Sequence, residues 1–221
     1  MSSKDCEHHG ADCERQRLYR RVFAAVLALL LLVLLTVLVV WLVLRPAKPA
    51  FYLRDVALSQ LAVVPGLPGG GGGSSLTVAA QVTLSSRNPN DRIGVYYDRM
   101  DVYAAYKGQQ VTVPTALPRG YQGHGDVALW SPNLWGTAVP LPQPLAQSLA
   151  QDTGAGVLLL QFRVGGRLRW KVGTWTSGTY HLFVNCPALL TTNSNNGSSG
   201  SGSGGYRLQQ QQGTVTCSVD V

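Results

Sequence analysis

Hydrophobic and polar residues are distributed unevenly along this chain. Residues 22–44 carry no charge, and Thr36 is their only residue with a hydroxyl group. In a helix, a segment of this length rises about 34 Å, which is enough to cross a hydrocarbon core of roughly 30 Å. A signal peptide has a shorter apolar core that ends at small residues, whereas Arg45 and Pro46 follow this one. The pattern predicts a single transmembrane helix over residues 22–44.

Beyond residue 45, short apolar stretches alternate with Gly, Pro, Asn and Asp. Two stretches place every second residue on one apolar face, namely Leu76, Val78, Ala80, Val82 and Leu84, and Leu158, Leu160, Phe162 and Val164. This mainly β pattern is typical of a β-sandwich. Further strands are expected over residues 51–61, 94–106, 109–113, 121–129, 169–174, 179–186 and 214–221, and one short helix over 144–152, opened by Pro144 and closed by Gly154.

Two low-complexity segments interrupt the strands. Residues 66–75 contain a run of five glycines, and residues 191–213 are rich in Ser, Gly, Asn and Gln, so both are predicted to be flexible loops. A phosphate-binding loop would need Lys-Ser or Lys-Thr at a helix start, whereas a strand follows these glycines. The predicted organisation is a tail over 1–21, the helix over 22–44 and one outer domain over 45–221.

Basic residues beside the apolar segment predict its orientation. Arginines 15, 17, 20 and 21 precede it, whereas Arg45, Lys48 and Arg54 follow. Because positive residues favour the cytosolic side, we expect a cytosolic tail and an outer C-terminal domain. That domain carries most of the net charge of +7. Outside the cell, acidic polymers or lipid headgroups are better partners for it than nucleic acid, and dispersed surface charge that only aids solubility is the simpler alternative.

The cysteines divide between the two sides of the predicted membrane. Cys186 and Cys217 each alternate with apolar residues on a predicted strand, so both sulfurs should point into the core and form a disulfide in an oxidising compartment. Two buried thiols are the alternative. Cys6 and Cys13 lie in the tail with two histidines, but their spacing fits no common zinc finger. Within the second predicted loop, Asn196-Gly197-Ser198 is an acceptor for N-linked sugar.

Candidate catalytic residues are scarce in the outer domain. It contains His124 and His181 but no Glu, and neither histidine lies beside a nucleophile motif. Asp126 lies two residues after His124, yet a structural loop explains this segment as well. We therefore expect no catalytic residue, no cofactor and no metal site.

The best candidate contact surface is a basic cluster around Gly165 and Gly166, which are predicted to form a hairpin turn. It comprises Arg163, Arg167, Arg169 and Lys171, interleaved with Trp170. The last three basic residues share one strand face, opposite apolar residues. A solvated outer face is the simpler interpretation, and binding of pectin-like polyanions or lipid headgroups is the functional one.

The sequence also resembles a known family at several ordered motifs. These are Asn88-Pro89-Asn90-Asp91-Arg92-Ile93-Gly94-Val95-Tyr96-Tyr97-Asp98, Tyr121-Gln122-Gly123-His124, Arg169-Trp170-Lys171-Val172-Gly173, Tyr180-His181-Leu182, Asn185-Cys186-Pro187 and Cys217-Ser218-Val219-Asp220-Val221. Together with the N-terminal apolar segment they resemble the plant NHL family, named for non-race-specific disease resistance and harpin-induced proteins, in the late embryogenesis abundant group-two superfamily. The glycine run and the long loop between the outer cysteines depart from simpler members.

The resemblance implies a Greek-key β-sandwich of the immunoglobulin or fibronectin III type, residence in the plasma membrane, and a role in pathogen or stress responses. It supplies no catalytic residues. Asn88, Pro89 and Asn90 read as a turn, because proline fixes φ and asparagine side chains bond to nearby backbone. We expect a membrane-anchored, non-enzymatic adhesion, scaffold or signalling protein that contacts cell-wall polyanions or membrane proteins, with self-association left open. A membrane-tethered module that binds apolar ligands or lipids is the alternative.

Overall fold

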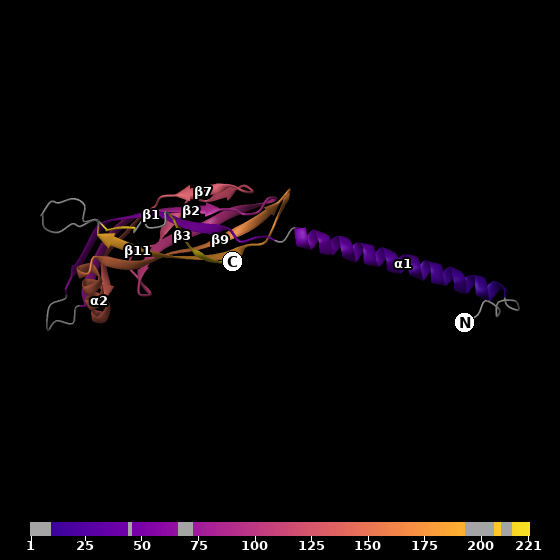
Figure 1. The fold of residues 1–221 in the computed structure, drawn as a ribbon, viewed down its shortest axis with the longest axis horizontal. Coiled ribbons are helices and arrows are strands. Elements are labelled where there is room, and N and C mark those ends of the chain that lie inside the picture. Colours follow the sequence, from indigo (N-terminus) through magenta and orange to yellow (C-terminus); the bar gives the residue numbers. More distant parts are fainter. Residues whose placement is uncertain (1–9, 44–45, 66–72, 193–205, 209–213) are drawn as a thin grey trace. The chain divides into compact units, whose positions relative to one another are not determined.

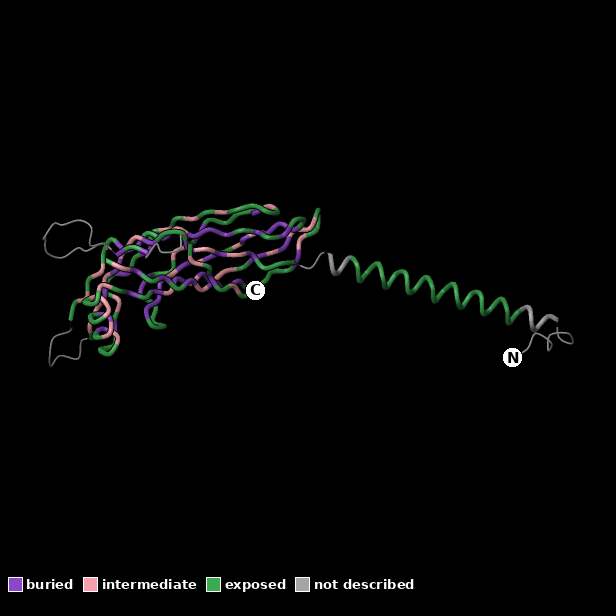
Figure 2. Tube along the Cα trace, viewed as in Figure 1, coloured by how far each residue is buried: buried purple, intermediate pink, exposed green. Residues whose placement is uncertain are grey.

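The computed structural model describes residues 10–43, 46–65, 73–192, 206–208 and 214–221. The chain divides into two compact units, residues 1–45 and 46–221. The first contains α1 (Gly10–Val43), whose segment Arg15–Val39 is long and apolar enough to cross a membrane. Its described side chains are all solvent-exposed, including leucines at about 60% (Figure 2). A helix that is apolar all round has no hydrophilic face to present to water, which agrees with the predicted transmembrane segment.

The second unit is mainly β and is built around one core (Figure 1). Its elements are β1 (Ala50–Val64), β2 (Ser74–Arg87), β3 (Ile93–Tyr106), β4 (Gln109–Gln110), β5 (Thr115–Leu117), β6 (Gly120–Gln122), β7 (Val127–Trp130), β8 (Asn133–Leu141), α2 (Gln143–Gly154), β9 (Val157–Val172), β10 (Trp175–Thr176), β11 (Tyr180–Thr192), β12 (Tyr206–Leu208), β13 (Val215–Thr216) and β14 (Ser218–Asp220).

All described strands join one antiparallel sheet in the order β4-β3-β9-β11-β12-β1-β2-β7. β5 and β6 pair with β3, whereas β7 and β8 pair with β2. The chain between β4 and β8 therefore crosses from one end of the strand order to the other. The sheet therefore curls into a half-barrel. The predicted Greek-key sandwich of two separate sheets is not confirmed, because short strands hydrogen-bond the two halves into one sheet.

Alternation along the long strands fills the concave side with apolar side chains, as Figure 2 shows by the repeated change of colour along each strand. Residues with no exposed surface include Phe51, Val82, Val95, Phe162 and Leu182, which come from five different strands. Burial of one such side chain contributes about 1.5 to 3 kcal/mol. The core thus draws on every long strand, and it contains both predicted apolar rows, Leu76 to Leu84 and Leu158 to Val164.

One predicted turn is wrong. Gly165 and Gly166 do not form a hairpin, because β9 runs through them without interruption and pairs with β3 on one side and β11 on the other. A Cβ on Gly166 would lie 2.5 Å from the carbonyl oxygen of Arg99. The glycine is thus needed for close approach of two strands, which a sequence cannot distinguish from a turn signal.

Helix α2 lies at one end of the sheet (Figure 1) and matches the predicted short helix, with Pro144 in its first turn. Ala146 and Leu149 are its buried residues, and the Tyr106 hydroxyl donates to Asp152 over 2.6 Å. Within the second predicted loop, Tyr206–Leu208 instead forms β12, since Tyr206 and Leu208 are both buried. Ser74 and Ser75, at the end of the first predicted loop, begin β2.

The C-terminal strands close the sheet between β1 and β11. β13 pairs with β1, β14 pairs with β11, and the Cys217 amide between them donates to the Phe51 carbonyl. A disulfide joins Cys217 to Cys186 of β11, with a Cα–Cα distance of 4.3 Å. Both cysteines are buried, as the strand pattern predicted. Asn196 lies outside the described residues.

Candidate functional site

The continuous β9 strand places Arg163, Arg167, Arg169 and Lys171 on one side of the sheet. Residues two apart along a strand face the same way, and the intervening Val164, Leu168 and Trp170 are buried in the core. Because Gly165 and Gly166 do not turn the chain, Arg163 lies in the same row as the other three. We call this surface of β3, β9 and β11 the basic outer face.

Neighbouring elements add both signs of charge to the basic outer face. Arg99 and Asp101 come from β3, opposite Arg167 and Gly165 of β9, and Arg119 precedes β6. Asp98 lies close enough to Arg119, Arg167 and Arg169 for all three to lower its pKa. Six basic side chains thus share this surface with two carboxylates. The surface is therefore cationic even after its ion pairs are counted.

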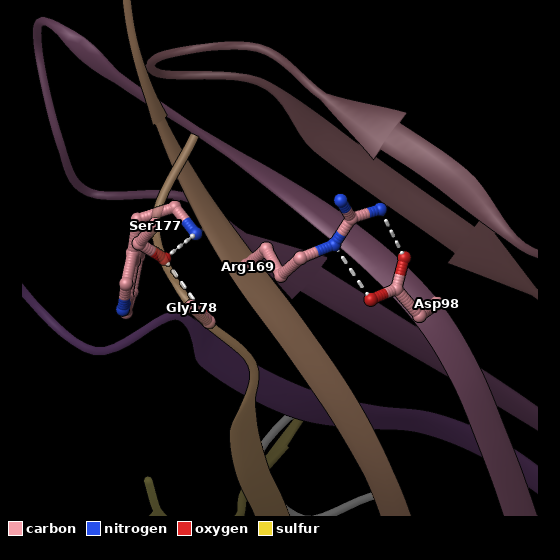
Figure 3. A network of polar contacts seen from close by, with 5 residues as sticks. Asp98, Arg169, Ser177 and Gly178 are labelled. Carbon is pink, nitrogen blue, oxygen red and sulfur yellow. Dashed lines mark hydrogen bonds and ion pairs between the residues drawn. The ribbon is translucent and has the colours of Figure 1, made fainter. Parts of the chain in front are cut away.

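Arg169 is the basic residue most firmly held. Its guanidinium donates two hydrogen bonds to Asp98, from Nε over 2.8 Å and from Nη2 over 2.6 Å (Figure 3). A β-bulge between Tyr97 and Arg99 leaves Asp98 without a cross-strand partner and free to reach β9. The hydrogen bonds from Arg169 lower the pKa of the Asp98 carboxyl. This pair fixes one end of the basic outer face.

Lys171 is held by tyrosines instead of a carboxylate. Its ammonium donates to the Tyr96 hydroxyl over 3.2 Å and lies 5.5 Å and 5.2 Å from the ring centroids of Tyr96 and Tyr121. The hydrogen bond to Tyr96 raises the pKa of Lys171. Aromatic faces attract a cation without neutralising it, so this positive charge stays available to a ligand.

Arg163 and Arg167 complete the row. Arg163 donates to the neutral Gln161 over 2.8 Å. Arg167 lies between Arg99 of β3 and His181 of β11 in the cross-strand register, and no ion pair of Arg167 occurs among the described residues. Like charges placed opposite each other on a sheet destabilise it. Arg99 does have a partner, Asp101, at 2.8 Å, whereas Arg167 has no carboxylate within ion-pair distance among the described residues.

The Asn88-Pro89-Asn90 turn is a structural site. The buried Asn88 amide donates to the carbonyls of Ile93 and Gly123 over 2.7 Å and 2.9 Å. The Asn90 side chain pairs with the backbone of Ala47, accepting from its amide and donating to its carbonyl, both over 2.8 Å. These hydrogen bonds connect the turn to Ala47, at the start of the outer domain, and to Ile93 and Gly123. The sequence predicts only the geometry of the turn.

The other candidate residues do not form a chemical centre with one another. His124 and Asp126 lie in the exposed turn that Asn88 and Gln122 hold by its backbone carbonyls. The Ser177 hydroxyl accepts a hydrogen bond from the Trp170 amide and donates one to the Gly178 carbonyl (Figure 3). It therefore stabilises the local loop structure. Across the part of the chain that the structure describes, no group of three His, Cys, Asp or Glu side chains could hold a metal ion.

A hollow of about 650 Å³ lies at the α2 end of the outer domain. It is lined by residues of β1 from Leu58 to Val63, by Ala150 and Thr153 of α2, and by Thr192 and Tyr206. Its lining mixes apolar side chains such as Leu61 with polar ones such as Gln60. No sequence pattern predicts this hollow, because residues of β1, α2, β11 and β12 come together to form it.

Comparison with known proteins places the chain in a family. A model described as late embryogenesis abundant protein matches residues 83–186. NDR1/HIN1-like protein 1 of Arabidopsis thaliana is 45% identical over 219 residues, covering 99% of this chain and 100% of that protein. NDR1/HIN1-like protein 12 of the same plant is 40% identical over 195 residues, covering 86% and 87%.

A solved structure of a protein from Archaeoglobus fulgidus covers 61% of this chain and 97% of its own, with 11% identity and a TM-score of 0.28, too low to support an argument. The sequence relatives are decisive, because their identity extends over almost the whole length of both proteins. They confirm the resemblance seen in the ordered motifs. The chain belongs to the NDR1/HIN1-like family of late embryogenesis abundant proteins.

Proposed function

We propose that this protein is a membrane-anchored, non-enzymatic component of plant stress or defence responses, which binds acidic polymers through its basic outer face. Membership of the NDR1/HIN1-like family supports the biological role. The apolar helix α1 supports the anchor. The arginines that precede the helix favour a cytosolic tail and an outer domain. The family resemblance favours the plasma membrane as the location.

One observation carries the binding proposal: Arg167 lies directly opposite Arg99 on an exposed sheet face, and Asp101 forms an ion pair with Arg99 alone among the described residues. Two opposed arginines cost stability that a merely solvated surface would avoid by using neutral residues. An anionic ligand removes that cost, and oriented guanidiniums suit carboxylates because they donate two parallel hydrogen bonds. Polyanions of the cell wall have this chemistry and lie on the side of the membrane where we place the domain.

The test is binding of the full-length protein, held in nanodiscs of neutral phosphatidylcholine, to polygalacturonate. Binding should weaken steeply between about 0.05 and 0.5 M salt, because exposed charges are screened over this range. Replacing Arg163, Arg167, Arg169 and Lys171 by Gln should weaken binding at low salt roughly tenfold or more.

A matched control removes the same charges elsewhere. Lys48, Arg87, Arg92 and Arg207 are also three arginines and one lysine, all exposed, and none lies on β3, β9 or β11. Their replacement by Gln keeps the net charge equal to that of the first variant and should leave binding much nearer to wild type. Equal loss in both variants would mean that net charge alone drives binding, and the basic outer face would then have no special role.

The hollow beside α2 favours a second candidate, a tethered module that binds an apolar ligand. Its volume of about 650 Å³ is within the range of small-molecule sites, roughly 300 to 1,000 Å³. Its mixed lining argues for the polymer-binding proposal, since apolar ligands are held mainly by apolar side chains. Co-purification of a stoichiometric lipid that is lost on Leu61→Asp substitution would favour this candidate.

A further inference from the structure

Gly165 is a glycine that the fold itself does not require. A Cβ built on it has no atom within 4 Å, and its φ is not in the left-handed region. The adjacent Gly166 differs, because its Cβ would collide with the backbone of Arg99. A glycine within a strand weakens the sheet unless a backbone or a ligand approaches closely. No described chain segment approaches Gly165, so the space above it is open to a ligand.

The space above Gly165 is a hollow of about 540 Å³ on the basic outer face. We call it the Gly165 hollow. Asp101 and Phe183 flank Gly165 on the two neighbouring strands, and Arg99, Arg167 and His181 lie one step along the same strands. The rings of His181 and Phe183 are nearly parallel, at 13°, with centroids 6.4 Å apart. The hollow therefore has a flat aromatic side and a charged side.

These groups select one kind of anion. Arg99 and Arg167 offer planar donors for a carboxylate. Asp101 repels any nearby anion but accepts hydrogen bonds from hydroxyl groups, so it favours a ligand that carries hydroxyls as well as its charge. Phe183 is 61% exposed and offers an apolar surface to the C–H face of a sugar ring. A sugar ring that carries both hydroxyls and a carboxylate satisfies all three, whereas a lipid phosphate uses only the arginines.

We propose that the Gly165 hollow binds a uronate, a pyranose ring carrying a carboxylate, within an acidic polysaccharide. The ring lies on Phe183, its carboxylate meets Arg167 and Arg99, and a ring hydroxyl donates to Asp101. This inference rests on the proposed function, because it names the sugar-specific site within a surface that also attracts polymers by charge.

The test uses Gly165→Leu in the full-length protein in phosphatidylcholine nanodiscs. A side chain at this position enters the hollow, and its Cβ has no atom within 4 Å. Gly178→Leu is the matched control, because Gly178 also has open space around its Cβ. Three probes are compared: oligogalacturonate, the same oligomer fully methyl-esterified, and poly-glutamate of equal charge. Phe183→Ala provides a second variant, and thermal unfolding checks that each variant is folded.

The wild-type protein should bind oligogalacturonate more tightly than poly-glutamate and the esterified oligomer. Both Gly165→Leu and Phe183→Ala should weaken oligogalacturonate binding roughly tenfold, or about 1.4 kcal/mol, and leave poly-glutamate binding unchanged. Gly178→Leu should bind as wild type does. Equal binding of oligogalacturonate by Gly165→Leu and wild type would overturn the uronate site while leaving the charge-driven function intact.

Two further outcomes would each overturn the uronate site for a different reason. If Gly165→Leu selectively loses binding to vesicles containing phosphatidylserine, the hollow recognises a lipid headgroup and the uronate assignment is wrong. If none of the polyanions binds the wild-type protein, the proposed function fails, and the inference fails with it.

Discussion

At the scale of single residues, buried polar groups organise one end of the outer domain. The Tyr97 hydroxyl donates to Gln122 over 2.9 Å and shares a 2.9 Å hydrogen bond with Ser86. Gln122 in turn donates to the carbonyls of Ser86 and Asp126, both over 2.8 Å. A buried polar group without a partner costs about 1 to 3 kcal/mol, so these residues fix one arrangement of the strands around them.

Burial makes Tyr97 a measurable contributor to the pH dependence of stability. Desolvation raises its pKa from 10.0 to about 12, and the hydrogen bond with Ser86 opposes this only in part. Below pH 10 the phenol is neutral in both folded and unfolded chains. Between pH 10 and 12 only the unfolded chain ionises, so the free energy of unfolding should fall as pH rises, by up to about 3 kcal/mol.

The measurement is the free energy of unfolding of wild type and Tyr97→Phe, by urea titration at pH 8 and near pH 11.5. Other tyrosines titrate in both proteins and cancel in the difference. The stability advantage of wild type over the variant should shrink at the higher pH. A difference that stays constant would show that Tyr97 ionises as readily in the folded protein as in the unfolded chain.

At the scale of elements, β9 shows what local patterns can and cannot predict. Alternation correctly placed Arg167, Arg169 and Lys171 on one face, because strand geometry depends only on neighbours in sequence. The Gly165-Gly166 pair was misassigned to a turn, because the close approach of Arg99 that requires Gly166 comes from a strand distant in sequence. For the same reason the pairing of Arg169 with Asp98 was not predictable, since it depends on a bulge in β3.

Local patterns did not predict β5, β8 and β12. β5 and β8 pair with β3 and β2, and β12 lies between β1 and β11, so each depends on strands that are distant in sequence. The disulfide, in contrast, was predictable, since Cys186 and Cys217 each continue a buried row. The β9 residues of the basic outer face could be predicted from the sequence. Its β3 residues and the Gly165 hollow could not, because they depend on the register between β3, β9 and β11.

The disulfide holds the C-terminal strands to β11, and its loss should weaken the closure of the sheet. It closes a loop with a sequence separation of 31 residues, which is worth roughly 3 to 4 kcal/mol in the chain-entropy model. The double variant Cys186→Ala and Cys217→Ala should lose about this much free energy of unfolding. Wild type should fall to the same stability in reductant, whereas the double variant should not respond. A loss below about 1 kcal/mol would show that β13 and β14 hold without the bridge.

At the scale of the whole molecule, the two units present different surfaces. From Val22 to Val39 the exposed residues of α1 are apolar except Thr36, while residues 46–221 enclose their apolar residues in a curled sheet and carry a cationic face. The sequence alone predicted this division, because residues 22–44 form a long uncharged run. The curvature of the sheet was not predictable, since it depends on short strands, β5 to β8 and β12 to β14, that pair with long strands distant in sequence.

The central claim is that β3, β9 and β11 present the surface that binds acidic polymers. Hydroxyl-radical footprinting of the full-length protein in nanodiscs, with and without polygalacturonate, tests it most directly. Phe183 and Tyr121, at 61% and 51% exposed, should lose reactivity on binding, whereas Leu129 and Trp135 of β7 and β8, at 59% and 52%, should not change. Protection of Leu129 and Trp135 with Phe183 and Tyr121 unchanged would contradict the account.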